Sequence, residues 1–100
     1  MRINFDEVLK ELDGSEITEK VKDVESQVTL KTICVRALTT PLQADANLTG
    51  EDAFKRLELA RKINKGGEQE IEPAQAVLIT DRAAKMFGIM VSGQVYEKLR

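Results

Sequence analysis

Residues 49–67 read TGEDAFKRLELARKINKGG, and this stretch carries the start and stop signals of a helix. Thr49 is a favourable N-cap, and the acids of the first turn face the positive end of the helix dipole. Basic residues gather in the last turn and two glycines follow, as is typical of a helix C-terminus. The sequence therefore predicts a helix over 50–64. Its expected buried side consists of Ala53, Phe54, Leu57, Ala60 and Ile63.

A second helix is predicted before it, from an N-cap at Thr29 to the proline at position 41. The residue before a proline disfavours helical backbone, so Pro41 marks the end. One apolar stripe with the spacing i, i+3, i+4, i+7, i+8 contains Leu30, Ile33, Cys34, Ala37 and Leu38. Because Cys34 lies on this stripe, we expect a buried, unreactive thiol.

The segment after the glycines predicts an extended connector over 68–72 and a third helix that starts with Pro73 at its first position. This helix is apolar on most sides up to Phe87, which is typical of a central helix in a bundle. Its only polar strip is narrow and consists of Gln75, Asp81, Arg82 and Lys85. Gly88 is expected to end it. Residues 89–99 then predict a short fourth helix or a loop plus helix, with Ser92 as a candidate cap.

The first 28 residues leave two readings open. Residues 4–7 resemble a capping box, and the apolar spacing that follows fits a helix stopped near Gly14. Alternatively, Asp13-Gly14 is a strong hairpin turn that would place Val8, Leu12 and Ile17 on one face. We favour a small hairpin or an extended arm for this acidic segment.

Together these patterns predict one domain over residues 1–100, with an acidic hairpin or arm at 1–28 and a helical bundle at 29–100. The fold class is mainly α: a small bundle of three to four helices with an N-terminal β-hairpin or extended arm. An α+β arrangement is the alternative. Since only four of 100 residues are aromatic, the core is expected to be aliphatic.

The composition argues against catalysis. The chain has no histidine and one cysteine, which removes the commonest general base, the Ser-His and Cys-His pairs and the usual zinc sites. No phosphate-binding glycine loop or nucleophile elbow is present. We expect no enzyme activity, no cofactor and no metal site. The lone cysteine, the absence of a secretory signal and the lack of an apolar run of membrane-spanning length predict a cytoplasmic protein with no membrane partner.

The best candidate for a partner-binding site is near the C-terminus, where the apolar stretch Ile89-Met90-Val91 lies beside Gly88 and Gly93. The candidate site residues are Met90, Val91 and Tyr96. If this stretch does not close the core, it forms an exposed apolar patch of the kind that marks a protein contact.

A basic run on the helix over 50–65 supports a different function, the binding of nucleic acid phosphates. It consists of Lys55, Arg56, Arg61, Lys62 and Lys65. Three acid-to-base pairs at i, i+4 would neutralise part of it: Glu51–Lys55, Asp52–Arg56 and Glu58–Lys62. The net charge of the whole chain is −2, so we expect nucleic acid to be the less favoured partner.

Several strings in residues 28–100 resemble small proteins encoded by tailed bacteriophages and prophages. These strings are TLK at 29–31, CVRAL at 34–38, TGED at 49–52, KRLELARKI at 55–63, AVLI at 76–79 and VSGQVY at 91–96. None of them is a chemical signature. The resemblance implies the cytoplasm of a bacterial host and a role in particle assembly, such as a tail-assembly chaperone, or in binding a phage or host regulatory protein.

From the sequence we therefore expect a non-enzymatic, phage-type protein-interaction module whose partner is another protein or a second copy of the chain. The alternative is a small nucleic-acid-binding regulator that uses the basic helix at 50–65.

Overall fold

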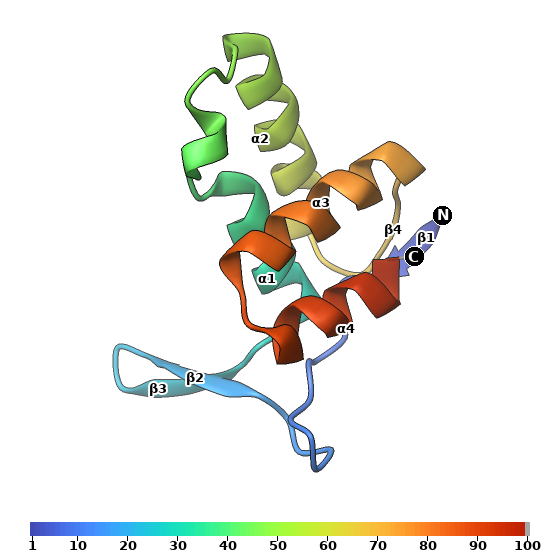
Figure 1. The fold of residues 1–100 in the computed structure, drawn as a ribbon. Coiled ribbons are helices and arrows are strands. Elements are labelled where there is room, and N and C mark those ends of the chain that lie inside the picture. Colours follow the sequence, from blue (N-terminus) through green and yellow to red (C-terminus); the bar gives the residue numbers. More distant parts are fainter. Residues whose placement is uncertain (100) are drawn as a thin grey trace.

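The computed structural model describes residues 1–99, which contain four helices and two antiparallel two-stranded sheets (Figure 1). Helices make up 54% of the chain, so the predicted helical bundle with an N-terminal β-element is confirmed. In chain order the elements are β1 (Arg2–Asn4), β2 (Thr18–Val21), β3 (Val24–Gln27), α1 (Leu30–Thr39), the 3₁₀ turn η1 (Gln43–Asp45), α2 (Gly50–Asn64), β4 (Glu68–Glu70), α3 (Pro73–Met86) and α4 (Ile89–Leu99).

Helix α1 forms as the sequence predicts. The Thr29 hydroxyl accepts a hydrogen bond from the Thr32 amide at 3.4 Å and caps the first turn. All five residues of the predicted apolar stripe are buried. Cys34 is among them, and burial raises the pKa of its thiol to about 12. The thiol is therefore protonated and unreactive at neutral pH, as expected.

Helix α2 has the predicted bounds, and the Thr49 hydroxyl accepts the Asp52 amide at 3.1 Å. Its predicted buried face is wrong in the first half of the helix. Phe54 is 60% exposed and Leu57 is 41% exposed; Ala53 is exposed as well. Figure 1 shows the reason, because the first turns of α2 stand above the other helices. The buried residues of this helix are Leu59, Ala60 and Ile63.

This difference gives a direct test on two leucines of one helix. Leu59→Ala is expected to lower the free energy of unfolding by about 2–4 kcal/mol, because Leu59 is only 5% exposed. Leu57→Ala is expected to lower it by only about 1 kcal/mol, because 41% of the Leu57 surface is already exposed to water in the folded chain. Urea unfolding followed by circular dichroism measures both values. Equal losses would contradict the orientation of α2 described here.

The first strand is held by a segment that lies more than sixty residues later in the chain. Strand β1 pairs antiparallel with β4, and Ile3 lies opposite Gln69. Next to this small sheet, Glu68 and Glu70 form ion pairs with the Arg2 side chain and the N-terminal ammonium, at 3.6 and 3.1 Å. The predicted extended connector is thus confirmed. It forms β4, whose pairing with β1 was not predicted from the local sequence.

Two hairpin turns lie between β1 and α1, at residues 11–15 and at residues 22–23. In the Glu11–Ser15 turn, the Glu11 amide donates a hydrogen bond to the Ser15 carbonyl at 2.7 Å. Gly14 has a φ of +89°, a backbone conformation that glycine adopts without strain. The expected turn at Asp13-Gly14 is confirmed, but Leu12 does not share a buried face with Val8 and Ile17, because it is 96% exposed. The regular hairpin is β2–β3, which projects from the body of the molecule (Figure 1).

The turn of that second hairpin consists of Lys22 and Asp23, whose φ angles are +52° and +64°. Both central residues are therefore left-handed, as two-residue hairpin turns of type I′ require. A Lys-Asp pair is not a typical sequence for this turn, which explains why the chain pattern did not indicate it. The side chains of β3 are all exposed.

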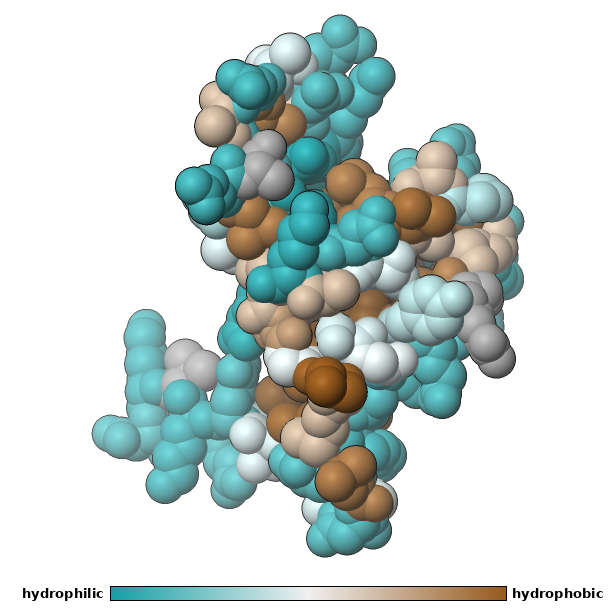
Figure 2. Space-filling model, viewed as in Figure 1, coloured by the Kyte–Doolittle hydropathy of each residue, from teal (hydrophilic) through white to brown (hydrophobic). Residues whose placement is uncertain are grey.

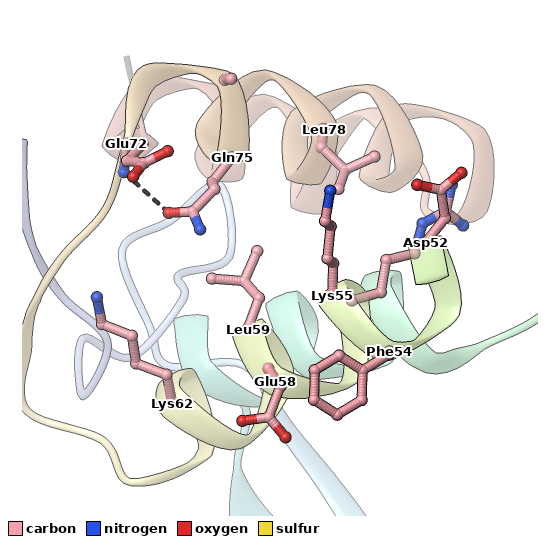
Figure 3. A pocket seen from close by; sticks show the side chains of 11 residues that line it. Asp52, Phe54, Lys55, Glu58, Leu59, Lys62, Glu72, Gln75 and Leu78 are labelled. Atoms are coloured by element: carbon pink, nitrogen blue, oxygen red, sulfur yellow. Dashed lines mark hydrogen bonds between the residues drawn. The ribbon is translucent and has the colours of Figure 1, made fainter. Parts of the chain in front are cut away.

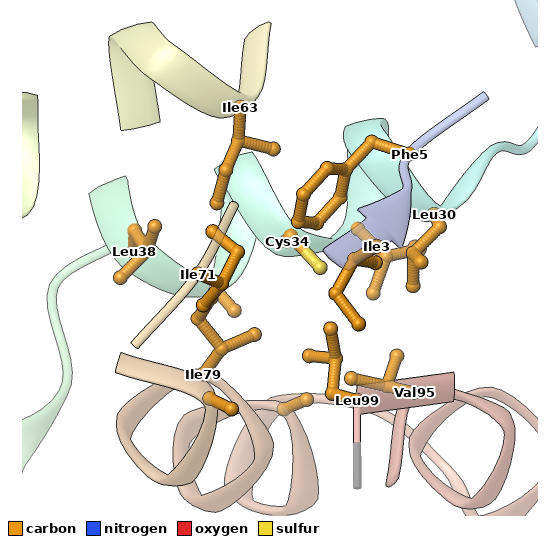
Figure 4. Packing of buried hydrophobic residues seen from close by; sticks show 14 of the residues in the cluster. Ile3, Phe5, Leu30, Cys34, Leu38, Ile63, Ile71, Ile79, Val95 and Leu99 are labelled. Atoms are coloured by element: carbon orange, nitrogen blue, oxygen red, sulfur yellow. The ribbon is translucent and has the colours of Figure 1, made fainter. Parts of the chain in front are cut away.

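All four described helices and the N-terminal segment contribute to one aliphatic core (Figure 4). Phe5 is fully buried, and Figure 4 shows its ring directed into the cluster beside Cys34. Helix α3 is less buried than predicted, since Val77 is 58% exposed. Helix α4 begins at Ile89, so Ser92 lies inside the helix and is not its cap.

One charged residue, Arg82 of α3, is buried where the sequence predicts a polar strip. Its guanidinium donates to the carbonyls of Ala37 and Thr40 and to Asp45 Oδ1, the last at 2.8 Å. Arg56 of α2 donates to the same oxygen at 2.7 Å. The two guanidinium groups hold the pKa of the Asp45 carboxyl well below its usual range. This arginine clasp ties the loop between α1 and α2 to α3.

Candidate functional site

The strongest exposed apolar feature lies where the Glu11–Ser15 turn meets the start of α4. Leu12 is 96% exposed, Ile89 is 90% exposed and Met90 is 36% exposed. These three residues line one shallow hollow of about 380 Å³. We call Leu12, Ile89, Met90 and Gly93 the end surface. In the lower part of Figure 2, separate brown groups of side chains stand out among white and teal ones.

A side-chain clamp fixes the turn against α4. The Gln94 amide accepts the Lys10 backbone N–H at 2.9 Å and donates to the Lys10 carbonyl at 2.8 Å. It also donates to the Met90 carbonyl one turn earlier in its own helix, at 2.7 Å. The turn that presents Leu12 is therefore held in one place on the helix, which lowers the entropy lost when a partner binds.

Gly93 lies in the middle of α4, where glycine destabilises a helix by about 0.5–1 kcal/mol relative to alanine. A Cβ atom added at this position would meet nothing within 4 Å. Packing within the described chain thus does not require glycine here. It lines the same hollow as Leu12 and Ile89, so its absent side chain leaves room for a close approach from outside.

The predicted partner-binding residues take different positions on α4. Met90 lies at the hollow, and Tyr96 is 59% exposed on the same helix. Val91 is half-buried and packs against the core. Leu12 was predicted to lie on the inner face of the hairpin and not at a binding site, although the Asp13-Gly14 turn signal directly follows it and acids flank it on both sides.

The rim of the end surface is acidic. Residues 6–16 contain five acids and one lysine, a net charge of −4. Lys10 forms an ion pair with Glu16 at 3.5 Å. Glu11 and Glu97 line the hollow and form no ion pair within the described part of the chain. An apolar partner segment flanked by basic residues matches this surface.

The basic run on α2 does not form one continuous cationic face. Lys55 pairs with Glu51 at 3.3 Å, as the sequence predicts. The other two predicted pairs are wrong in the structure, because Arg56 binds Asp45 and Lys62 donates to the carbonyl of Glu70.

The remaining members of the run lie on the outer side of the same helix. Arg61 pairs with Glu58 at 2.7 Å, and Lys65 is exposed at the C-cap. The five residues predicted to bind nucleic acid are therefore divided between the clasp, the helix surface and the groove described next.

A groove of about 930 Å³ separates α2 from α3. Its apolar lining residues include Phe54, Leu59 and Leu78. Figure 3 shows Lys55 and Lys62 extending from α2 into this groove, with Leu59 between them. Two acids, Asp52 and Glu72, lie at its two ends in the same view.

The comparison of the chain with protein-family models, with curated proteins and with solved structures gave no match. Within residues 1–99, no group of three or more His, Cys, Asp or Glu side chains is placed to hold a metal ion. In the same range no helix combines the length and the apolar character that a membrane crossing requires. The end surface and the groove between α2 and α3 are therefore the features from which a function can be inferred.

Proposed function

We propose that this protein is a non-enzymatic interaction module that binds another protein through the end surface. The observation that carries this proposal is the pair Leu12 and Ile89, which lie at one hollow although 77 positions separate them in the chain. Both side chains are at least 90% exposed. The setting is the one that the phage resemblance implies, a bacterial host cytoplasm, where the protein acts as an accessory factor or tail-assembly chaperone.

Energetics support a binding role for this surface. Removing a leucine or isoleucine side chain from water contributes about 1.5–3 kcal/mol. Leu12 and Ile89 line one hollow and are both exposed, so their burial is an unused source of binding free energy, and exposed apolar patches mark contact sites. The Gln94 clamp on Lys10 keeps Leu12 in position before a partner arrives.

The nucleic-acid alternative stays a prediction. Its five basic residues include Arg56, which is half-buried in the clasp, and Lys55 and Arg61, which are paired with acids of the same helix. These pairs reduce the positive charge that α2 can offer to phosphates. An affinity for DNA or RNA that falls steeply with salt would support it.

Site-specific photocrosslinking tests the proposed function. Ile89 is replaced by p-benzoylphenylalanine, the protein is produced in bacteria during phage growth, and the adducts are identified by mass spectrometry. We expect discrete protein adducts from position 89, because the end surface is occupied by a partner. Adding Leu12→Ser is expected to reduce their yield severalfold, since the side chain is 96% exposed and its loss leaves the fold intact.

The control places the crosslinker at Val24, which is 63% exposed on the projecting hairpin and outside the end surface. This position is expected to give none of the same adducts, and Val24→Ser is expected to leave the adducts of position 89 unchanged. Identical adducts from both positions, or adducts that do not respond to Leu12→Ser, would contradict the proposal.

A further inference from the structure

The charges around the end surface indicate the chemistry of its partner. Two segments build this surface, residues 6–16 and helix α4, and each of their two lysines is paired with an acid. Lys10 lies 3.5 Å from Glu16, and Lys98 lies 2.7 Å from Glu7. The exposed acids of the two segments that form no ion pair within residues 1–99 are Asp6, Glu11, Asp13 and Glu97. The charge that remains for a partner is therefore negative.

Two of these acids, Glu11 on the turn and Glu97 on α4, line the same hollow as the exposed apolar side chains. Leu12 and Ile89 are each at least 90% exposed there. Opposite charges around an apolar contact supply orientation and specificity. We infer that the end surface binds an amphipathic helix of another protein, in which lysines or arginines flank the apolar side chains. This inference rests on the proposed function and names the chemistry of the partner.

A second copy of this chain does not offer that chemistry. Two end surfaces that face each other would bring like charges together, which costs free energy. The most basic segment of the chain, residues 55–65, has a net charge of +4. Its Arg56 is bound to Asp45, however, and Lys55 and Arg61 are paired with acids of α2. The partner is therefore a different protein that carries its own basic segment.

The backbone of the turn favours a helix over an added strand as the occupant. The N–H and the carbonyl of Lys10 are both bonded to the Gln94 amide, at 2.9 and 2.8 Å. The Glu11 N–H donates to the Ser15 carbonyl at 2.7 Å. A partner strand finds no row of vacant backbone groups to pair with here. A helix satisfies its own backbone, so it needs only the side chains that the end surface presents.

Glycine at position 93 gives such a helix room. Ile89 and Gly93 are one turn apart on α4 and line the same hollow. A Cβ atom at Gly93 would meet nothing within 4 Å, so this side of α4 is open at that point. Because the distance between packed helices depends on the side chains at the contact, a partner helix can lie close to α4 here.

Selection from a random peptide library tests this inference without assuming a partner sequence. Peptides of about 16 residues, roughly four helical turns, are displayed on their messenger RNA and selected on the immobilised full chain. The recovered pool is then divided by its binding to the unmodified chain and to Leu12→Ser. We expect the peptides that need Leu12 to be enriched in lysine and arginine over the starting library. Their apolar residues are expected at the helical spacing i, i+3, i+4.

The affinity of one selected peptide, measured by fluorescence anisotropy, tests the charge directly. Glu11→Lys/Glu97→Lys is expected to weaken binding by at least about tenfold. The matched control, Glu25→Lys/Asp81→Lys, changes the net charge equally at two exposed acids that do not line the hollow, and it is expected to bind like the unmodified chain. Raising the salt from about 50 to 500 mM is expected to weaken binding severalfold. Circular dichroism verifies that every variant is folded.

Leu12-dependent peptides with no excess of lysine and arginine would overturn this inference, and so would equal losses of affinity in the two charge-reversed variants. In both cases binding of a protein through the end surface, the proposed function, still stands. If no peptide distinguishes the unmodified chain from Leu12→Ser, the inference also fails. The proposed function is then decided separately, by whether position 89 gives Leu12-dependent adducts.

Discussion

Phe5→Ala is expected to lower the free energy of unfolding by about 3–5 kcal/mol, as large as any single truncation in this chain. The side chain has no exposed surface, and it comes from an irregular segment rather than from a helix. Its backbone also joins two distant segments, because its amide donates to the Gly67 carbonyl and its carbonyl accepts the Lys31 amide, both at 2.9 Å. Loss of the ring therefore leaves a cavity at the point where the N-terminal segment meets α1 and the glycine loop.

Urea unfolding of Phe5→Ala measures this loss, and Phe54→Ala is the matched control. Phe54 is 60% exposed, so its truncation is expected to change stability by less than about 1 kcal/mol. A domain of this size has about 5–15 kcal/mol of stability in all. The Phe5 variant is thus expected to be strongly destabilised or unfolded. Equal effects of the two substitutions would show that the N-terminal segment is not part of the core.

Arg82→Ala is expected to have an effect of similar size, about 3–5 kcal/mol, because it breaks a buried ion pair and leaves its partners unsatisfied. The Ala37 and Thr40 carbonyls lose their donor, and Asp45 loses one of two guanidinium groups. Lys85→Ala, one turn later on the exposed side of α3, is the control and is expected to stay within about 0.5 kcal/mol of the unmodified chain.

The clasp also predicts how stability depends on pH. The pKa of Asp45 is lowered in the folded chain, whereas in the unfolded chain it lies near the ordinary value of 3.8. In acid the unfolded state therefore binds the proton first, and the stability that the clasp provides declines as the pH falls below about 4. Thermal unfolding at a series of pH values measures this decline. It is expected to be shallower in Asp45→Asn, and equal slopes for the two chains would exclude a contribution from Asp45.

Local chemistry alone was sufficient for the helices. Caps at Thr29 and Thr49, the proline at position 73 and the glycines after α2 and α3 act on neighbouring backbone groups, so their effects can be read from a few adjacent residues. For this reason the bounds of α1, α2 and α3 agree with the patterns. The predicted buried stripe of α1 was also correct. This helix contacts the core along its whole length, so the helical spacing of its apolar residues is enough to identify its buried face.

The sequence could not decide which apolar residues are covered, because covering depends on what lies opposite each helix. Phe54 and Leu57 fit the spacing of a buried stripe, but no other element covers them in the structure. Arg82 fits the spacing of a solvent-facing strip, but it is buried because η1 places Asp45 within hydrogen-bond distance of it. Leu12 likewise fits an inner face of the first hairpin by its spacing, but no element covers it and its side chain is exposed.

What the sequence determined by itself is therefore the ends of α1, α2 and α3 and the absence of histidine chemistry, since these follow from residue identity and spacing. Only the tertiary structure decided that β1 pairs with β4, that Leu12 and Ile89 line one hollow, and that Arg82 of α3 binds Asp45 of η1. Those contacts join segments that are tens of residues apart. Their free energy comes from surfaces that exist only after the chain has folded, so no local pattern records them.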